Sequence, residues 1–366
     1  MPEFMQGEEL CRKFYEECVH TILSEHYPAL NYSAGLLGYG SEVLGFDTLM
    51  SRDHDWGPRM QLFLTAEDAK QVGEEINELL SRELPYEFYG YSTHFGPPNE
   101  SDNGTRKLED ISAGFVSHRI IVTSLEAYLK DYFPVNVMGE ISEVDWLVIP
   151  QQKLRSIVDG AVFYDGLNIL KTIQEKLRWY PESVWIYLMA SAWSRIGQEE
   201  HLMGRCGTVE DEVGSYLLGA SLSQVLMQLA FLMEKIYAPY PKWFGTAFRE
   251  LKLAADLYPA FEEVRTARTW QERQGGLVKA YLVLIRQMNS MKMIESVDEE
   301  VVDFFGRPFK VIHAGKIAES LRKLLRDTPL VNMPLIGNID IVTSSTDVVE
   351  NNIICHQFGD FYKGLM

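Results

Sequence analysis

The chain has 366 residues, more than a single hydrophobic core usually holds, so we expect two domains. Its formal net charge of −18 argues against a protein that holds nucleic acid mainly through its overall field, and we expect no strong general nucleic-acid affinity. No stretch approaches the roughly 20 apolar residues of a membrane span, and the N-terminus does not resemble a signal peptide. Four cysteines without Cys-x-x-Cys spacing are typical of free thiols, so we expect a cytoplasmic protein with no membrane partner.

Helical and extended patterns alternate over the first 150 residues. The predicted elements are, in chain order, a helix over 6–27, strands over 33–40 and 60–64, a helix over 65–84, a strand over 86–93, a polar loop over 94–110, a strand over 115–123 and a helix to 133. Loops as long as the polar one are often lids or binding loops. The alternation indicates a small mixed α/β domain that ends near Pro150.

Two pairs of residues lie between the first two predicted strands. Eleven residues separate Gly40-Ser41 from Asp53-x-Asp55. In an extended segment the two aspartates would share one face, and their carboxylates would repel each other unless a cation lay between them. Mg²⁺ is usually held by one or two carboxylates together with substrate phosphates. Gly40 lets the backbone approach a ligand, and a helix beginning at Ser41 would direct free N–H groups at a phosphate.

These four residues, Gly40, Ser41, Asp53 and Asp55, resemble the Gly-Ser … Asp-x-Asp signature of the nucleotidyltransferase superfamily, which includes DNA polymerase beta and the aminoglycoside adenylyltransferases. The alternative is a turn glycine followed by a solvated acidic loop. The resemblance implies that a nucleoside triphosphate, expected to be ATP, binds near Gly40 and Ser41. It also implies that Asp53 and Asp55 hold Mg²⁺ or Mn²⁺.

Active members of that superfamily usually add a third acidic residue on a later strand, and the segment 116–123 has none. His118 is the nearest candidate base there, although histidine is a poor ligand for Mg²⁺. Glu87 on the predicted strand 86–93 is the other candidate, with a solvated strand residue as its alternative. The departure leaves open a one-metal enzyme or a nucleotide binder without turnover.

Beyond Pro150 the pattern becomes almost entirely helical. It predicts a helical bundle over 151–327 and an irregular C-terminal tail over 328–366 that packs on the bundle. The apolar run 216–237 predicts a buried central helix. The predicted fold class is therefore α+β, and the resemblance implies that the mixed α/β head over 1–150, which precedes the bundle, is small and nucleotidyltransferase-like.

Four polar residues of the bundle are candidates for a cleft between the two domains. Glu200, His201 and Arg205 lie on one helical stretch, where they would supply a base and a phosphate contact or form a solvated ion-pair face. Lys242 would reach a triphosphate or lie along the neighbouring Trp243. The absence of Walker A and Gly-x-Gly-x-x-Gly sequences disfavours a P-loop kinase or a nicotinamide dehydrogenase.

A second resemblance covers most of the chain. The stretch from Tyr237 to Trp243 is similar to the Y-x-P-Y-x-K-W block of the domain-of-unknown-function 4037 family (DUF4037). Further similar segments are Asp145-Trp146-Leu147, Ile149-Pro150, Gly160 with Phe163 and Asp165, Arg307-Pro308-Phe309, and Ile336-Gly337 with Asp340. The family implies a nucleotidyltransferase-like head with a helical partner domain.

Together the two resemblances imply transfer of a nucleoside monophosphate to a hydroxyl acceptor in the cleft between the domains. The acceptor would be a small molecule, a protein or an RNA. The alternative is a non-catalytic nucleotide-binding or interaction module on the same fold, because the third carboxylate is missing.

Overall fold

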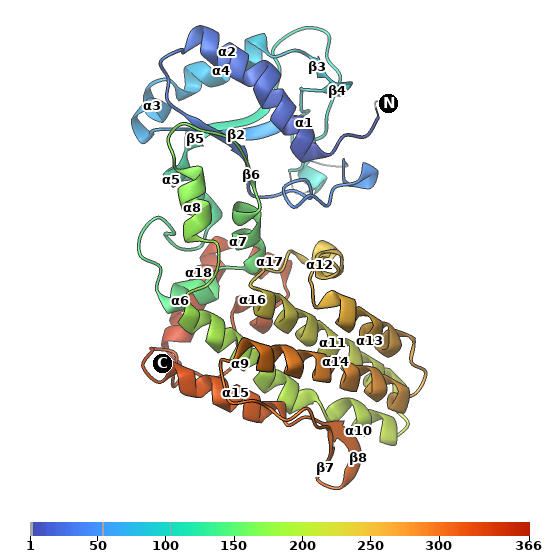
Figure 1. Ribbon diagram of the computed structural model, residues 1–366. Coiled ribbons are helices and arrows are strands. Elements are labelled where there is room, and N and C mark those ends of the chain that lie inside the picture. Colours follow the sequence, from blue (N-terminus) through green and yellow to red (C-terminus); the bar gives the residue numbers. More distant parts are fainter. Residues whose placement is uncertain (1–2, 53–54, 103) are drawn as a thin grey trace. The chain divides into compact units, whose positions relative to one another are not determined.

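The computed structural model describes residues 3–52, 55–102 and 104–366. The chain forms two compact units (Figure 1). The first unit comprises 1–140 and 153–178, and the second comprises 141–152 and 179–366. The chain therefore passes between the units three times, whereas the sequence predicted a single boundary near Pro150.

A four-stranded sheet in the order β5-β2-β1-β6 organises the first unit. Its strands are β1 (Ser33–Leu36), β2 (Arg59–Leu64), β5 (Arg119–Ser124) and β6 (Ala161–Asp165). Strand β2 is antiparallel to β1 and parallel to β5. The chain returns to the first unit after residue 152 because β6, which begins eleven residues after Pro150, completes the sheet by pairing with β1.

The helices of the first unit largely match the predicted ones. Helices α1 (Gly7–Phe14) and α2 (His20–His26), joined by a π-helical turn over Tyr15–Val19, make up the predicted helix 6–27. The predicted helix 65–84 is interrupted at Val72, which separates α3 (Ala66–Gln71) from α4 (Gly73–Glu83). The remaining helices are α5 (Leu125–Tyr132), α7 (Gln151–Val158, of which the first two residues belong to the second unit) and α8 (Leu170–Lys176).

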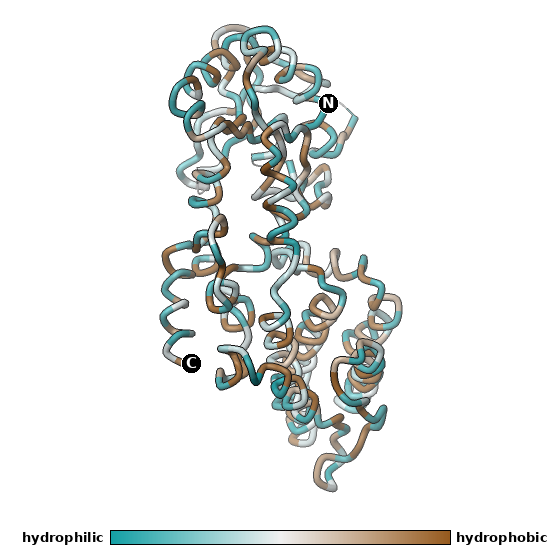
Figure 2. Tube along the Cα trace, turned by 60° about the vertical axis from the view of Figure 1, so that its left-hand side comes forward, coloured by the Kyte–Doolittle hydropathy of each residue, from teal (hydrophilic) through white to brown (hydrophobic). Residues whose placement is uncertain are grey.

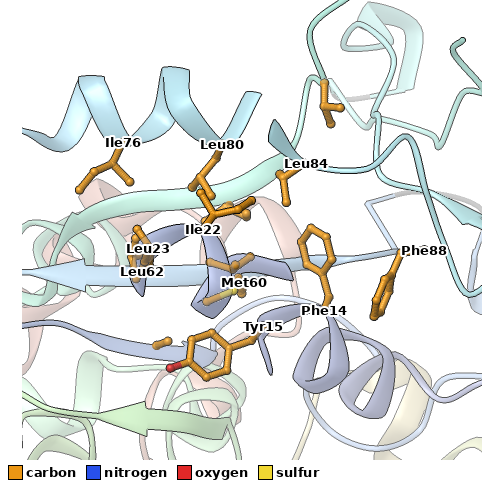
Figure 3. Packing of buried hydrophobic residues seen from close by; sticks show 14 of the residues in the cluster. Phe14, Tyr15, Ile22, Leu23, Met60, Leu62, Ile76, Leu80, Leu84 and Phe88 are labelled. Carbon is orange, nitrogen blue, oxygen red and sulfur yellow. The ribbon is translucent and has the colours of Figure 1, made fainter. Parts of the chain in front are cut away.

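Hydrophobic residues on one face of the sheet form the core of this unit. Figure 3 shows Met60 and Leu62 of β2 among side chains from α1, α2 and α4. Because side chains alternate along a strand, Arg59, Gln61 and Phe63 belong to the opposite face. Phe63 packs there against Tyr128 of α5, with ring centroids 5.5 Å apart. The polar residues of β2 therefore lie on the face away from this core.

One predicted strand of this unit is instead a hairpin. The segment 86–93 contains β3 (Glu87–Phe88) and β4 (Tyr91–Ser92), which pair in antiparallel fashion. Tyr89 and Gly90 between them both have positive φ angles, as a two-residue hairpin turn requires. The tyrosine-rich alternation was compatible with either structure, and the turn at Gly90 decides between them.

The second unit is mainly helical, and hydrophobic and hydrophilic positions are interspersed along its helices (Figure 2). Its helices are α6 (Glu143–Val148), α9 (Glu182–Glu199), α10 (Leu202–Thr208), α11 (Glu212–Glu234), α12 (Pro241–Phe248), α13 (Ala254–Thr266), α14 (Trp270–Met291) and α15 (Ala314–Arg322). A hairpin of β7 (Val302–Phe304) and β8 (Arg307–Val311) interrupts the helical pattern. The predicted α+β fold class is thus confirmed, with a helical C-terminal region.

Two expectations for this unit need correction. The tail beyond residue 327 is not irregular, because it contains α16 (Ile339–Val342), α17 (Thr346–Val349) and the twelve-residue α18 (Asn352–Lys363). Among the described residues, α11 is also long and apolar enough by composition to cross a membrane, contrary to the expectation that no stretch approaches that length. Half of its apolar window is buried, and it packs on α9, α10 and α14, as the core helix of a globular unit does.

Candidate functional site

The turn after β1 is held by side chains from two other elements. Gln61 of β2 accepts a hydrogen bond from the Leu37 amide at 2.8 Å and donates one to the Leu37 carbonyl at 3.1 Å. Tyr128 of α5 donates to the same carbonyl at 3.1 Å. Because β1 and β2 are antiparallel, this turn lies at the end of the sheet where β2 begins, and β5 begins at the same end. The predicted Gly-Ser motif is thus anchored on the sheet.

Gly40 is required here by its surroundings. Its φ is +133°, and a Cβ atom on it would lie 2.4 Å from the Arg59 guanidinium and 2.6 Å from the Glu42 carboxylate. Arg59 is buried, pairs with Glu42 at 2.6 Å and donates to the Tyr39 carbonyl. Ser41 is buried and begins a series of turns to Phe46. No helix begins at Ser41, so the helix N-terminus expected as a phosphate site is not formed there.

Asp55, from the second half of the motif, lies on a loop ahead of β2. Asp53 and His54 fall outside the described residues, and Asp55 has a φ of +50°. The backbone at Asp55 is therefore not extended, and the argument that places both aspartates on one face of an extended segment does not apply. The Asp55 amide donates to the Arg106 carbonyl at 2.8 Å, which ties this loop to the predicted polar loop 94–110.

Asp55 forms an ion pair with Arg119, the first residue of β5, at 2.8 Å. Both side chains are 37% exposed. The pKa of Arg119 is lowered by burial, with the nearby charges of Arg59 and Arg106 acting in the same direction and Asp55 opposing them. Three arginines therefore gather at the end of the sheet where Arg59 and Arg119 are register partners. Strand β5, where the superfamily usually has its third carboxylate, begins with Arg119 instead.

Sequence reasoning missed a buried carboxylate beside this loop. Asp47 is 5% exposed, and its Oδ2 atom accepts hydrogen bonds from the Gly7 amide at 2.8 Å and from Trp56 Nε1 at 2.9 Å. Its Oδ1 atom has no partner within the described structure. Asp47 thus joins the start of α1 to the segment that carries Asp55. Nothing in the local sequence distinguished Asp47 from the other acidic residues of the chain.

The described residues place limits on a metal site. No group of three or more His, Cys, Asp or Glu side chains within 3–52, 55–102 and 104–366 could hold a metal ion. Mg²⁺ is usually held by one or two carboxylates with substrate phosphates completing its shell. Asp55 is a carboxylate of the kind that binds such an ion, and in this structure it is paired with Arg119.

The other candidates from the first unit have local partners. The ring of His118 is bonded through Nε2 to the Asn77 carbonyl of α4 at 3.1 Å and through Nδ1 to the Ile120 amide at 3.2 Å. Burial lowers the pKa of His118, so the ring is neutral at physiological pH. Glu87 is exposed on the β3-β4 hairpin. Neither side chain makes a contact with Asp55 among those that the structure describes.

The bundle candidates form two separate groups within the second unit. The Glu200 carboxylate is buried and accepts hydrogen bonds from the amides of Ile312 at 2.8 Å and Ala314 at 3.3 Å, at the start of α15. His201 and Arg205 lie against the ring of Phe304, at 4.2 Å and 5.7 Å. Lys242, near the start of α12, is exposed and lies over the Trp243 ring at 5.0 Å.

Comparisons with known proteins give a match to a protein family and similarity to solved structures. Curated proteins include no match to this chain. A nucleotidyltransferase-like protein from Exiguobacterium sibiricum 255-15 is similar over 85% of this chain and 89% of its own, with 12% identity and a TM-score of 0.34. The matched family is described as a domain of unknown function, and its model covers neither Gly40 nor Asp55. Residues 146–244 of this chain match that family, DUF4037.

Proposed function

We propose that the first unit binds a nucleoside triphosphate with a divalent cation and transfers its nucleoside monophosphate to a hydroxyl acceptor. One observation carries this proposal. The Gly40 turn, the Asp55 carboxylate and the guanidinium of Arg119 all lie at the end of the sheet where β2 and β5 begin. A carboxylate beside cations is a combination suited to a phosphate ester with its metal.

Residues of the first unit would bind the cation and the phosphates. Asp55 would hold the cation from one side, and Arg119 and Arg106 would neutralise phosphate charge. Mg²⁺ or Mn²⁺, when bound, would supply further charge neutralisation at the phosphates. Arg59 would keep the turn at Gly40 in place through Glu42 and the Tyr39 carbonyl. Catalysis would then come mainly from positioning and electrostatics.

The acceptor is proposed only as a class, a hydroxyl on a small molecule, a protein or an RNA. ATP is the proposed donor because the resemblance is to adenylyltransferases. We also propose a cytoplasmic location, which the four free cysteines support.

A second function is favoured by one specific observation. The β2 and β5 positions on the face away from the core include Arg59, Gln61 and Arg119, and none of these strand positions is a carboxylate. A nucleotide-binding module without turnover would need only the cations and the glycine turn. The two functions differ in whether pyrophosphate is released.

The test uses the full chain with each nucleoside triphosphate labelled at the α-phosphate, Mg²⁺ or Mn²⁺, and a panel of hydroxyl acceptors. Release of pyrophosphate with label transfer is expected, and Asp55→Asn should reduce it by about 100-fold. Asp110→Asn, an exposed residue of the predicted polar loop 94–110, is the matched control and should leave it unchanged. Equal rates in both variants would contradict the assignment of Asp55, whereas binding without release would favour the second function.

A further inference from the structure

The ion pair between Asp55 and Arg119 occupies the carboxylate to which the proposed function assigns the cation. The two side chains come from segments 64 residues apart, meet at 2.8 Å and are each 37% exposed. Exposed ion pairs contribute little net stability, because their attraction is screened and two long side chains must be held in place. Their partners can therefore be exchanged at small cost.

The surroundings of Arg119 favour an anion richer in charge than one carboxylate. Arg59 and Arg106 are close enough to disfavour its charged form, and Arg59 already has its own buried partner in Glu42. Arg106 donates weakly to the Gly96 carbonyl at 3.4 Å, and no ion pair to it is found within the described residues. Around these three arginines the described ion pairs supply two carboxylates, Glu42 and Asp55. A polyphosphate would relieve the repulsion among the three cations.

We propose that Arg119 acts as an exchange residue, which leaves Asp55 for the phosphate chain when a divalent cation and a triphosphate bind together. In this exchange Asp55 passes from the guanidinium to the cation, and Arg119 passes from the carboxylate to a phosphate oxygen. Each charge keeps an opposite partner throughout. A cation alone would displace Arg119 into the field of two other arginines, and a triphosphate alone would leave Asp55 unpaired beside an anion.

The consequence is positive coupling between the two ligands. Each should raise the affinity of the other by the same factor, because coupling between two binding sites is reciprocal. The inference rests on the proposed function for the identity of the ligand. It concerns binding alone, so it can fail or succeed without turnover.

The experiment measures binding to the full chain without chemistry. Mn²⁺ binding is followed by the loss of the free-ion signal in electron paramagnetic resonance. Binding of a triphosphate analogue with a methylene group between the α- and β-phosphorus is followed by calorimetry, with Mg²⁺ or with a chelator. We expect the analogue to bind at least about tenfold more tightly with Mg²⁺. Equal affinity in both conditions would overturn the inference.

Substitution of Arg119 separates exchange from simple charge attraction. In Arg119→Gln, Mn²⁺ alone should bind about threefold more tightly because Asp55 is released, while the analogue should bind about tenfold more weakly. Adding Asp55→Asn should abolish the gain for Mn²⁺. Lys70→Gln removes the same charge from exposed α3, on the core side of the sheet, and should change neither affinity. An Arg119→Gln protein that matches Lys70→Gln in both measurements would contradict the inference.

Arg119→Lys provides a second variant with the charge retained. A single ammonium cannot form the two parallel hydrogen bonds of a guanidinium with a phosphate, so its affinity for the analogue should lie between those of the parent and Arg119→Gln. If coupling is found but no acceptor is ever labelled, the exchange stands and the transferase proposal fails. If label is transferred but coupling is absent, the transferase proposal stands and the exchange proposal fails.

Discussion

Two carboxylates of this protein illustrate opposite ways of accommodating a negative charge. Glu200 in the second unit is 6% exposed and lies against backbone amides at the start of α15. Asp55 in the first unit is 37% exposed and is paired with one arginine side chain. Glu200 is held by backbone amides, whereas Asp55 is held by a partly exposed arginine side chain. The comparison separates a carboxylate that supports the fold from one that can serve a ligand.

The same comparison explains why a shifted pKa alone is a poor guide to a functional site. Burial raises the pKa of Glu200 from 4.5 to about 7, which would suit a catalytic base. Its hydrogen bonds instead show a structural role, since they link the end of α9 to the beginning of α15. The pKa of a residue becomes informative about function only together with the groups that it contacts.

The largest effect is expected from Glu200→Ala. The substitution leaves the amides of Ile312 and Ala314 without an acceptor in a buried setting, at a cost of about 3 kcal/mol in the free energy of unfolding of the second unit. Urea denaturation followed by tryptophan fluorescence measures it, because only Trp56 of the seven tryptophans lies in the first unit. A loss of less than about 0.5 kcal/mol would contradict the structural role of Glu200.

A change with pH should follow from the same side chain. The folded state holds the Glu200 proton more tightly than the unfolded state, so stability is greatest below pH 4.5 for this group and falls as pH rises to about 7. Asp340, whose pKa burial raises from 3.8 to about 6, contributes in the same direction. Glu200→Gln should flatten the dependence between pH 6 and 7, which unfolding curves at several pH values would test. If the free energy of unfolding of Glu200→Gln changed with pH as steeply as that of the parent, another group would be responsible for the dependence.

Gly40→Ala should destabilise the first unit more than Arg119→Gln does. A methyl group at φ +133° would be strained and would press on Arg59 and Glu42, at a cost of about 2 kcal/mol. Hydrogen exchange of peptides covering 33–41 and 59–64, measured by mass spectrometry, should report faster exchange. Gly104→Ala is a control with positive φ and open space around it, and it should affect only its own loop.

The smallest effect on stability is expected from Arg119→Gln. Its ion pair with Asp55 is exposed, so removing it should cost at most about 1 kcal/mol. The same exchange measurement on the peptide covering 119–124 would check this. A large loss would make Asp55 and Arg119 as structural as Glu200, and would remove the contrast on which the exchange proposal depends.

Local patterns predicted much of the fold and part of the candidate site. The helices predicted to begin near residues 65 and 124 are capped by Thr65 and Ser124, whose side chains each accept a hydrogen bond from the amide three residues on. Gly40 and Ser41 follow β1 at the predicted place. The pairing of β6 with β1 could not be predicted, because it joins segments more than 120 residues apart and nothing local marks the partner.

Local sequence patterns account for most of the helices and strands, for the α+β class and for the order of Gly40, Asp55 and the arginines along the chain. These features depend on the periodicity of side chains and on turn residues, which act over a few positions. Tertiary contacts make Arg119 the register partner of Arg59 and the ion-pair partner of Asp55, and they bring Glu200 to the start of α15. Strand register and helix packing bring distant segments together, and the role of each charge follows from what it meets there.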